Sequence, residues 1–180
     1  MAIKNRIFGK GTKTMGEMKK YELAAETKVD FFGKTLFRIK ALVSFGSVKA
    51  GELGGFIEKE ENLSQSGNAW VYGDAEVSGD ARVSGNAWVY GDARVSGNAE
   101  VSGDAEVSGN ADYTTIKGFG SCFRCSTFFR CKDKEVRVVC GCFYGTIEEF
   151  RKKVKKTHRE TKLAEEYLMI ADLMEKHFSE

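Results

Sequence analysis

Residues 67–114 read GNAWVY GDAEVS GDARVS GNAWVY GDARVS GNAEVS GDAEVS GNADYT, which is eight consecutive copies of one six-residue unit. Counted from its valine, each unit has an aliphatic residue, then Gly-Asn or Gly-Asp, then an alanine four positions after the valine. Gly, Asn and Asp adopt positive φ at low cost and suit the corners of a coil, while Val and Ala fit a narrow interior. This pattern predicts a parallel β-helix built from hexapeptide repeats.

The charged residues at the outward positions indicate how many hexads make one coil. If three hexads form a coil, residues 18 apart are neighbours on adjacent coils, so Glu76 lies beside Arg94 and Arg82 lies beside Glu100. A spacing of 12 would instead place Arg82 beside Arg94, and a spacing of 24 would place Glu76 beside Glu100. Because opposite charges on neighbouring strands stabilise a sheet and like charges destabilise it, we expect three hexads per coil.

The repeat extends weakly in front of residue 67 and stops at Tyr113. Gly55, Ile57, Asn62 and Leu63 fall in register and form one degenerate coil. Tyr113 stands at a valine position, where its side chain is too large for the interior. We therefore expect about three to four coils.

The segments that flank the hexads carry a resemblance to a known superfamily. They are residues 34–39 (KTLFRI), 54–58 (GGFIE) and 141–150 (GCFYGTIEEF), and the similarity covers roughly residues 21–178. With the hexads, they resemble small bacteriophage and prophage proteins of the left-handed parallel β-helix superfamily, which are often labelled as hexapeptide-repeat transferases or polymer-forming proteins. The resemblance implies a left-handed coil and a phage origin, but no particular activity, because one fold hosts many functions.

Composition favours a cytoplasmic protein. The chain has 180 residues with 20 Gly and no Pro, as suits a solenoid whose backbone N–H groups must bond to the next coil. No apolar run approaches the ~18 residues needed to cross a bilayer, and the first residues lack the apolar stretch of a signal peptide. We expect no membrane contact.

Charge is unevenly distributed along the chain. The net charge is +2, made up of +7 in residues 1–50, −3 in 51–66, −6 in 67–114 and +4 in 115–180. The acidic centre would repel phosphate groups, which excludes a general nucleic-acid binder. Only the basic ends could contact nucleic acid, and we favour a protein partner.

The expected fold class is mainly β, a short left-handed parallel β-helix capped by β-hairpins at both ends and followed by C-terminal α-helices. The N-terminal hairpin comprises strands at residues 21–29 and 34–42, and the C-terminal hairpin comprises strands at 127–131 and 135–140. Thr146 begins a helix, with Glu149 completing a capping box, and a second helix spans about 160–178. We divide the chain into a flexible basic arm (1–17), an N-terminal hairpin cap (18–50), the solenoid (51–114) and a C-terminal α+β cap (115–180).

The candidate partner-binding residues are aromatic and basic. At a spacing of 18, Trp70 stacks on Trp88 and Tyr72 on Tyr90, which would leave a patch too apolar to face water. We expect either the terminal segments of the chain or a partner to cover it, since Trp and Tyr are favoured anchors. The basic face of the helix after Thr146 adds three residues to this set: Arg151, Lys152 and Lys155.

The cysteines form a second candidate site. They are Cys122, Cys125, Cys131, Cys140 and Cys142, an odd number that suits thiols or a metal better than a disulfide framework. A pair spaced as Cys122 and Cys125 can hold a tetrahedral zinc, with His158 as an outside ligand. The alternatives are a disulfide or redox pair and thiols without a shared role, so a structural zinc is the only cofactor that we consider.

The function that we expect is non-catalytic protein–protein interaction. Acyltransferases of the superfamily use a histidine as general base near a trimer groove, whereas the two histidines here, His158 and His177, follow the repeats. We expect the chain to bind itself as a dimer or trimer, or to bind a host protein, for example as an inhibitor of a CRISPR-type defence protein. The alternatives are an acyltransferase at a trimer groove and a self-assembling structural protein.

Overall fold

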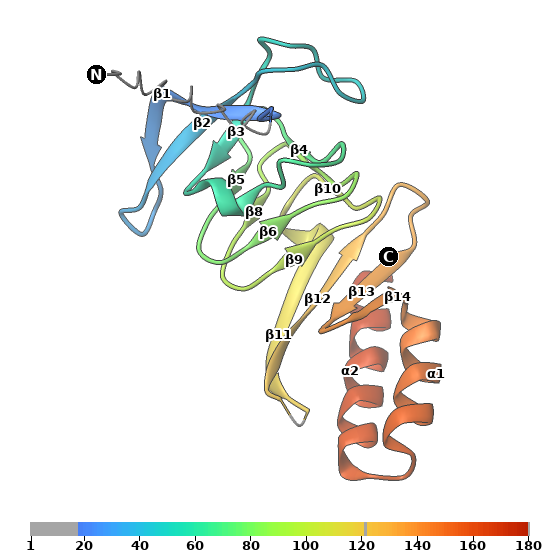
Figure 1. Ribbon diagram of the computed structural model, residues 1–180. Helices are drawn as coiled ribbons and strands as arrows, with labels where there is room; N and C mark the ends of the chain where they lie inside the picture. The colour runs from blue at the N-terminus through green and yellow to red at the C-terminus, as the bar shows by residue number, and fades with distance from the viewer. Residues whose placement is uncertain (1–17, 121, 180) are drawn as a thin grey trace, which may run out of the picture.

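The computed structural model describes residues 18–120 and 122–179, so the arm expected at residues 1–17 lies outside the described residues. The fold is mainly β, with two helices at the C-terminal end (Figure 1). Within the described residues, no helix is long and apolar enough to cross a membrane. The strands are β1 (Tyr21–Val29), β2 (Thr35–Ala41), β3 (Leu53–Ile57), β4 (Trp70–Val71), β5 (Glu76–Val77), β6 (Arg82–Val83), β7 (Trp88–Val89), β8 (Arg94–Val95), β9 (Glu100–Val101), β10 (Glu106–Val107), β11 (Tyr113–Phe119), β12 (Arg124–Arg130), β13 (Val136–Cys140) and β14 (Phe143–Thr146), and the helices are α1 (Ile147–His158) and α2 (Lys162–Phe178).

The hexads form two-residue strands that pair in parallel with the strand three hexads further along. Trp70 pairs with Trp88, Glu76 with Arg94, and Arg82 with Glu100. These pairs confirm the spacing of 18 residues that the charges predicted. The strands fall into three groups, β4-β7-β10, β3-β5-β8 and β6-β9, so successive hexads lie on three different sides of the repeat region.

Alanines and valines fill the repeat interior. From Ala69 to Val107 every hexad alanine and valine is at most 1% exposed. The corners need glycine, as Gly85 illustrates: its φ is +69°, and a Cβ there would lie 2.9 Å from the backbone N of Gly103 on the next coil. The Gly, Ala and Val positions of the hexad thus follow from the backbone conformation and the narrow core.

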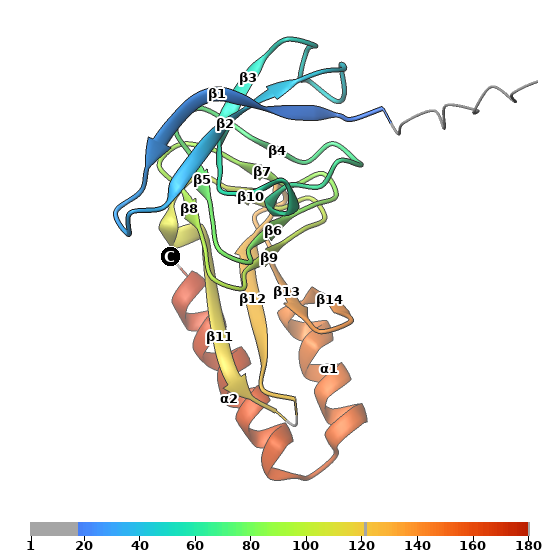
Figure 2. The ribbon, with the colours of Figure 1, turned by 60° about the vertical axis from the view of Figure 1, so that its left-hand side comes forward.

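The two N-terminal strands pair antiparallel, as predicted, and β2 also pairs antiparallel with β3. Tyr21 and Ile39 belong to the same buried cluster as the repeat valines. The Tyr21 hydroxyl lies 2.8 Å from the carbonyl oxygen of Glu60 and 2.7 Å from that of Leu63. Figures 1 and 2 place β1 and β2 at the end of the repeats away from the helices.

The C-terminal part contains a four-stranded antiparallel sheet, ordered β11-β12-β13-β14, where the sequence predicted one hairpin. The predicted hairpin corresponds to β12 and β13, and β11 and β14 add a strand at each side. The sheet lies between the repeats and the helices (Figures 1 and 2), with Phe129 in the repeat core and Phe128 in the helix core. Alternation of side chains along β12 therefore joins the two cores.

The two predicted helices are confirmed. Thr146 caps α1, since its Oγ1 accepts a hydrogen bond from the Glu149 N–H at 3.1 Å while the Thr146 N–H donates to the Glu149 carboxylate at 2.8 Å. The buried stripe of α1 consists of Ile147, Phe150 and Val154, facing the sheet and α2.

Candidate functional site

The predicted ladder of four aromatic residues does not form one exposed patch. Trp70 is fully buried, with its ring 6.1 Å from the ring of Tyr21 and 5.3 Å from that of Phe45. In the described part of the chain, its indole N–H has no hydrogen-bond partner. The prediction that Trp70 contacts a partner is therefore wrong for this structure, because the N-terminal segment covers it.

The other three rings remain partly exposed on the side formed by β4, β7 and β10, and we call Tyr72, Trp88 and Tyr90 the aromatic face. The rings of Tyr72 and Trp88 lie 5.3 Å apart, and the Lys132 ammonium lies 4.1 Å from the Trp88 ring centre. The Tyr90 hydroxyl donates to Glu106 at 3.2 Å. Burial, and next the Glu106 charge, raise the pKa of Tyr90, so its hydroxyl stays protonated at neutral pH.

A hollow of about 560 Å³ adjoins the aromatic face and shares Tyr90 with it, and Lys132, which lies over the Trp88 ring, also lines this hollow. Arg130 lines this hollow, 3.6 Å from Asp112, and donates to the Phe178 carbonyl oxygen at 2.9 Å. Aromatic rings beside an Arg side chain are a composition typical of protein-binding surfaces.

The basic residues predicted on α1 have different surroundings. Arg151 donates to Asp172 and Glu175 of α2, each at 2.7 Å, and these contacts raise its pKa. Its side chain is 17% exposed, so its contacts join the two helices and the prediction of a partner-binding role is not supported. Lys152 and Lys155 are exposed, but the sheet separates α1 from the repeats, so they do not extend the aromatic face.

The structure does not bring the five cysteines together. Cys131 belongs to the repeat core, on one face of the sheet, whereas Cys140 packs against the helix core on the other. Burial raises the pKa of Cys131 to about 11, and Cys140 accepts a hydrogen bond from Ser126 at 3.1 Å. In residues 18–120 and 122–179, no group of three or more His, Cys, Asp or Glu side chains is placed to hold a metal ion, so Cys122, Cys125 and Cys142 do not complete a zinc site either.

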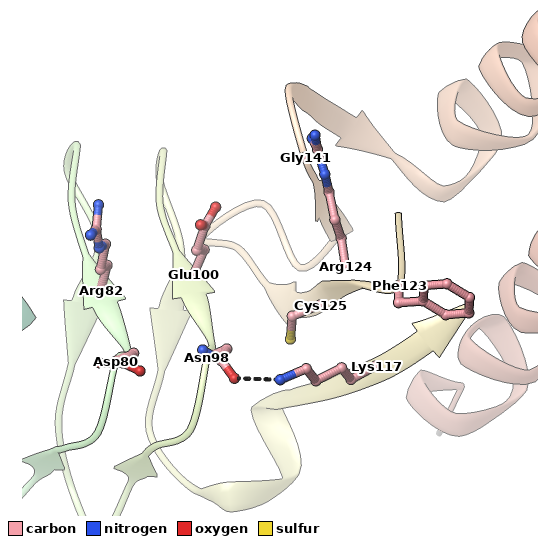
Figure 3. A pocket seen from close by; sticks show the side chains of 9 residues that line it. All are labelled: Asp80, Arg82, Asn98, Glu100, Lys117, Phe123, Arg124, Cys125 and Gly141. Carbon is pink, nitrogen blue, oxygen red and sulfur yellow. Dashed lines mark hydrogen bonds between the residues drawn. The ribbon is translucent and has the colours of Figure 1, made fainter. Parts of the chain in front are cut away.

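A second recess, which the sequence did not predict, lies between the β6-β9 side of the repeats and the β11–β12 hairpin (Figure 3). We call it the charged groove, with a volume of about 490 Å³. In Figure 3 the side chains of Arg82, Glu100 and Arg124 extend toward the same side, and Lys117 reaches across to Asn98 at 3.2 Å. The groove is lined by Asp80, Arg82, Asn98, Glu100, Lys117, Phe123, Arg124, Cys125 and Gly141.

The charged groove escaped prediction because its two walls are far apart in sequence. Arg82 and Glu100 were interpreted as a charge pair on neighbouring coils, which explains them without a ligand. Lys117 lies on β11, a strand that was not predicted. The outward position of Arg82 was the available signal, but it gave no indication of the wall opposite.

The fold and the hexads together define a β-solenoid repeat protein. A family model described as YdcK beta solenoid repeat matches residues 75–91 and again residues 87–103. The matched segment contains the β6-β9 pair and the Trp88 of the aromatic face, and it covers only part of the chain. None of the curated proteins matches the sequence.

Proposed function

We propose that this chain is a non-catalytic interaction protein that binds another protein through the aromatic face. The observation that supports the proposal is the partly exposed stack of Tyr72, Trp88 and Lys132. Lys132 comes from the turn after β12, so the C-terminal sheet and the repeats build this surface together. A Trp flanked by Tyr and a cation, next to a hollow lined by Arg, has the chemistry of an interface anchor.

The architecture that we propose is a left-handed solenoid of three to four coils, capped at both ends by the terminal segments. The left hand rests on the resemblance to the hexapeptide-repeat superfamily. The caps are supported by Tyr21 and Phe129, which join the repeat core from opposite ends of the chain. Capped ends disfavour growth of the solenoid by end-to-end stacking, so we expect partners to approach the sides.

The partner that we propose is a protein of a bacterial host, in keeping with the resemblance to phage proteins, and a defence protein is the first candidate. The test is recovery of partners from host lysate on immobilised protein, comparing the wild type with Trp88→Ala. Removing an anchoring Trp is expected to weaken binding by about 2 kcal/mol or more. Arg94→Ala is the control, because Arg94 occupies the same hexad position on a neighbouring side.

Two outcomes would contradict the proposal. One is recovery of the same proteins in the same amounts by the wild type and by Trp88→Ala. The other is recovery of the chain alone, and light scattering of the purified protein would then establish whether the aromatic face joins copies of this chain.

A further inference from the structure

The charged groove is separate from the aromatic face. Its repeat wall is the β6-β9 side, whereas the aromatic face occupies the β4-β7-β10 side. The opposite wall comes from β11 and β12, and the turn before β14 adds Gly141. Variants in the groove therefore leave the aromatic face unchanged.

Two arginines in the groove have side chains that make no hydrogen bond or ion pair with any described residue: Arg82 on β6 and Arg124 on β12. Arg94 provides a comparison, since residues 79–84 and 91–96 have the identical sequence GDARVS. Arg94 lies 3.6 Å from Glu76, so the same hexad supplies a paired arginine on one side and an unpaired one in the groove. Unpaired guanidinium groups that share a recess are available to an anionic ligand.

The Arg124 guanidinium lies close to the turn before β14. A Cβ at Gly141 would lie 2.7 Å from the Arg124 Nη1, and Gly141 has a φ of +62°. Glycine at this position therefore allows the guanidinium to lie against the backbone.

Apart from Glu100, the other charged side chains of the groove do not offset the positive charge of the two arginines. Asp80 is paired with Lys59 at 2.8 Å, and the Lys117 ammonium donates to the neutral Asn98 side chain rather than to a carboxylate. Burial is the main cause that raises the pKa of Cys125, so its thiol is neutral at physiological pH. Glu100 is the one carboxylate in the groove without an ion pair among the described residues.

The groove continues along the β6-β9 side of the repeats. A second hollow of about 420 Å³ shares Arg82 and Glu100 with it and extends past Ser84 and Ser102 to Glu61. Two adjoining hollows along one side favour an elongated ligand over a compact one. Serine hydroxyls and Glu100 can bond to the backbone N–H groups of an extended chain.

We propose that the charged groove binds an extended peptide segment of a partner protein, with acidic side chains of that segment bound to Arg82 and to Arg124, on either side of Glu100 (Figure 3). Guanidinium groups bind carboxylates with paired hydrogen bonds, and Lys117 adds positive charge at the same end. Glu100 repels a doubly charged phosphate more strongly than a singly charged carboxylate. The ligand is therefore a carboxylate-bearing peptide.

The test is fluorescence anisotropy with a labelled peptide of about eight residues in which Glu alternates with Ser, since side chains alternate along an extended chain. We expect the Glu peptide to bind the full-length protein and a Lys-for-Glu peptide not to bind. Arg82→Gln and Arg124→Gln are each expected to weaken binding about tenfold. Arg94→Gln is the matched control and is expected to change binding by less than about twofold.

Three results would overturn the proposal: no binding of the Glu peptide to the wild type, equal binding by the two groove variants and the wild type, or displacement of the peptide by inorganic phosphate at the peptide's own concentration. The last result would identify a site for small anions. Circular dichroism of each variant checks that the fold is retained, which is expected because neither arginine side chain has a hydrogen-bond or ion-pair partner among the described residues. The peptide-binding test uses variants in the groove, whereas the partner-recovery test uses Trp88→Ala in the aromatic face. Either proposal can therefore fail while the other holds.

Discussion

At the scale of single residues, Trp70 and Trp88 show what a repeat sequence does not determine. Both stand in the hexad GNAWVY, yet Trp70 is fully buried and Trp88 is partly exposed. The difference arises from what lies over each ring: Tyr21 and Phe45 over Trp70, and Lys132 over Trp88. Identical local sequence predicts identical local structure, so the burial of each ring could not be predicted from the hexads.

Lys20 gives a prediction at this scale because its ammonium is buried, 4.9 Å from the centre of the Phe45 ring. It is 4% exposed and donates to the carbonyl oxygen of Ala69 at 2.9 Å, and burial lowers its pKa to about 8. An unfolded lysine titrates near pH 10.5, so between these two values the unfolded chain binds more protons and stability rises with pH. Tyr21 acts in the opposite direction above about pH 10, because burial raises its pKa.

The expected result is that urea unfolding of the wild type gives a free energy about 2 kcal/mol higher at pH 9.5 than at pH 7, after subtraction of the same difference measured for Lys20→Met. The methionine variant removes the titrating group and keeps most of the buried volume. The prediction is wrong if the free energies of unfolding of the wild type and of Lys20→Met differ by the same amount at pH 7 and at pH 9.5.

At the scale of elements, the corner glycines differ in what surrounds them. Gly85 and Gly73 have φ of +69° and +58°, but a Cβ at Gly85 meets the backbone of Gly103 whereas a Cβ at Gly73 meets nothing within 4 Å. Both alanine variants cost about 1–2 kcal/mol for the left-handed conformation. We expect Gly85→Ala to cost about 1–2 kcal/mol more than Gly73→Ala, because the next coil must move. If urea unfolding shows that the two variants lose the same stability, the neighbouring coil can move away from the added Cβ at little cost.

The elements that the sequence predicted are those whose pattern is local. The repeat strands follow from the Ala and Val periodicity, and α1 follows from its capping box and apolar stripe. Strand β11 was missed because Thr114, Thr115 and Lys117 give it polar residues on both faces, so its identity depends on pairing with β12. The charged groove was missed with it, since β11 supplies part of the second wall.

At the scale of the whole molecule, strand β12 connects two hydrophobic cores. Phe129 packs in the repeat core and Phe128 in the helix core, and both are fully buried. Because the same strand packs in both cores, loss of one core should destabilise the other, and the chain should unfold as one cooperative unit. Both tryptophans lie in the repeats, on β4 and β7, whereas the helices are C-terminal, so fluorescence and circular dichroism report on different parts.

For the wild type we expect tryptophan fluorescence and far-ultraviolet circular dichroism to give coincident urea transitions. Phe129→Ala should cost about 3 kcal/mol, the usual loss for a buried Phe, because it leaves a cavity between the sheet and the repeats. The helical signal should then be lost at lower urea than the tryptophan signal, since the helix core retains Phe128 but loses its support. Phe123→Ala is the control: its ring is 68% exposed, and its removal should change stability by less than about 0.5 kcal/mol. Coincident transitions in Phe129→Ala at wild-type stability would mean that the sheet and the repeats are held together by contacts other than this ring.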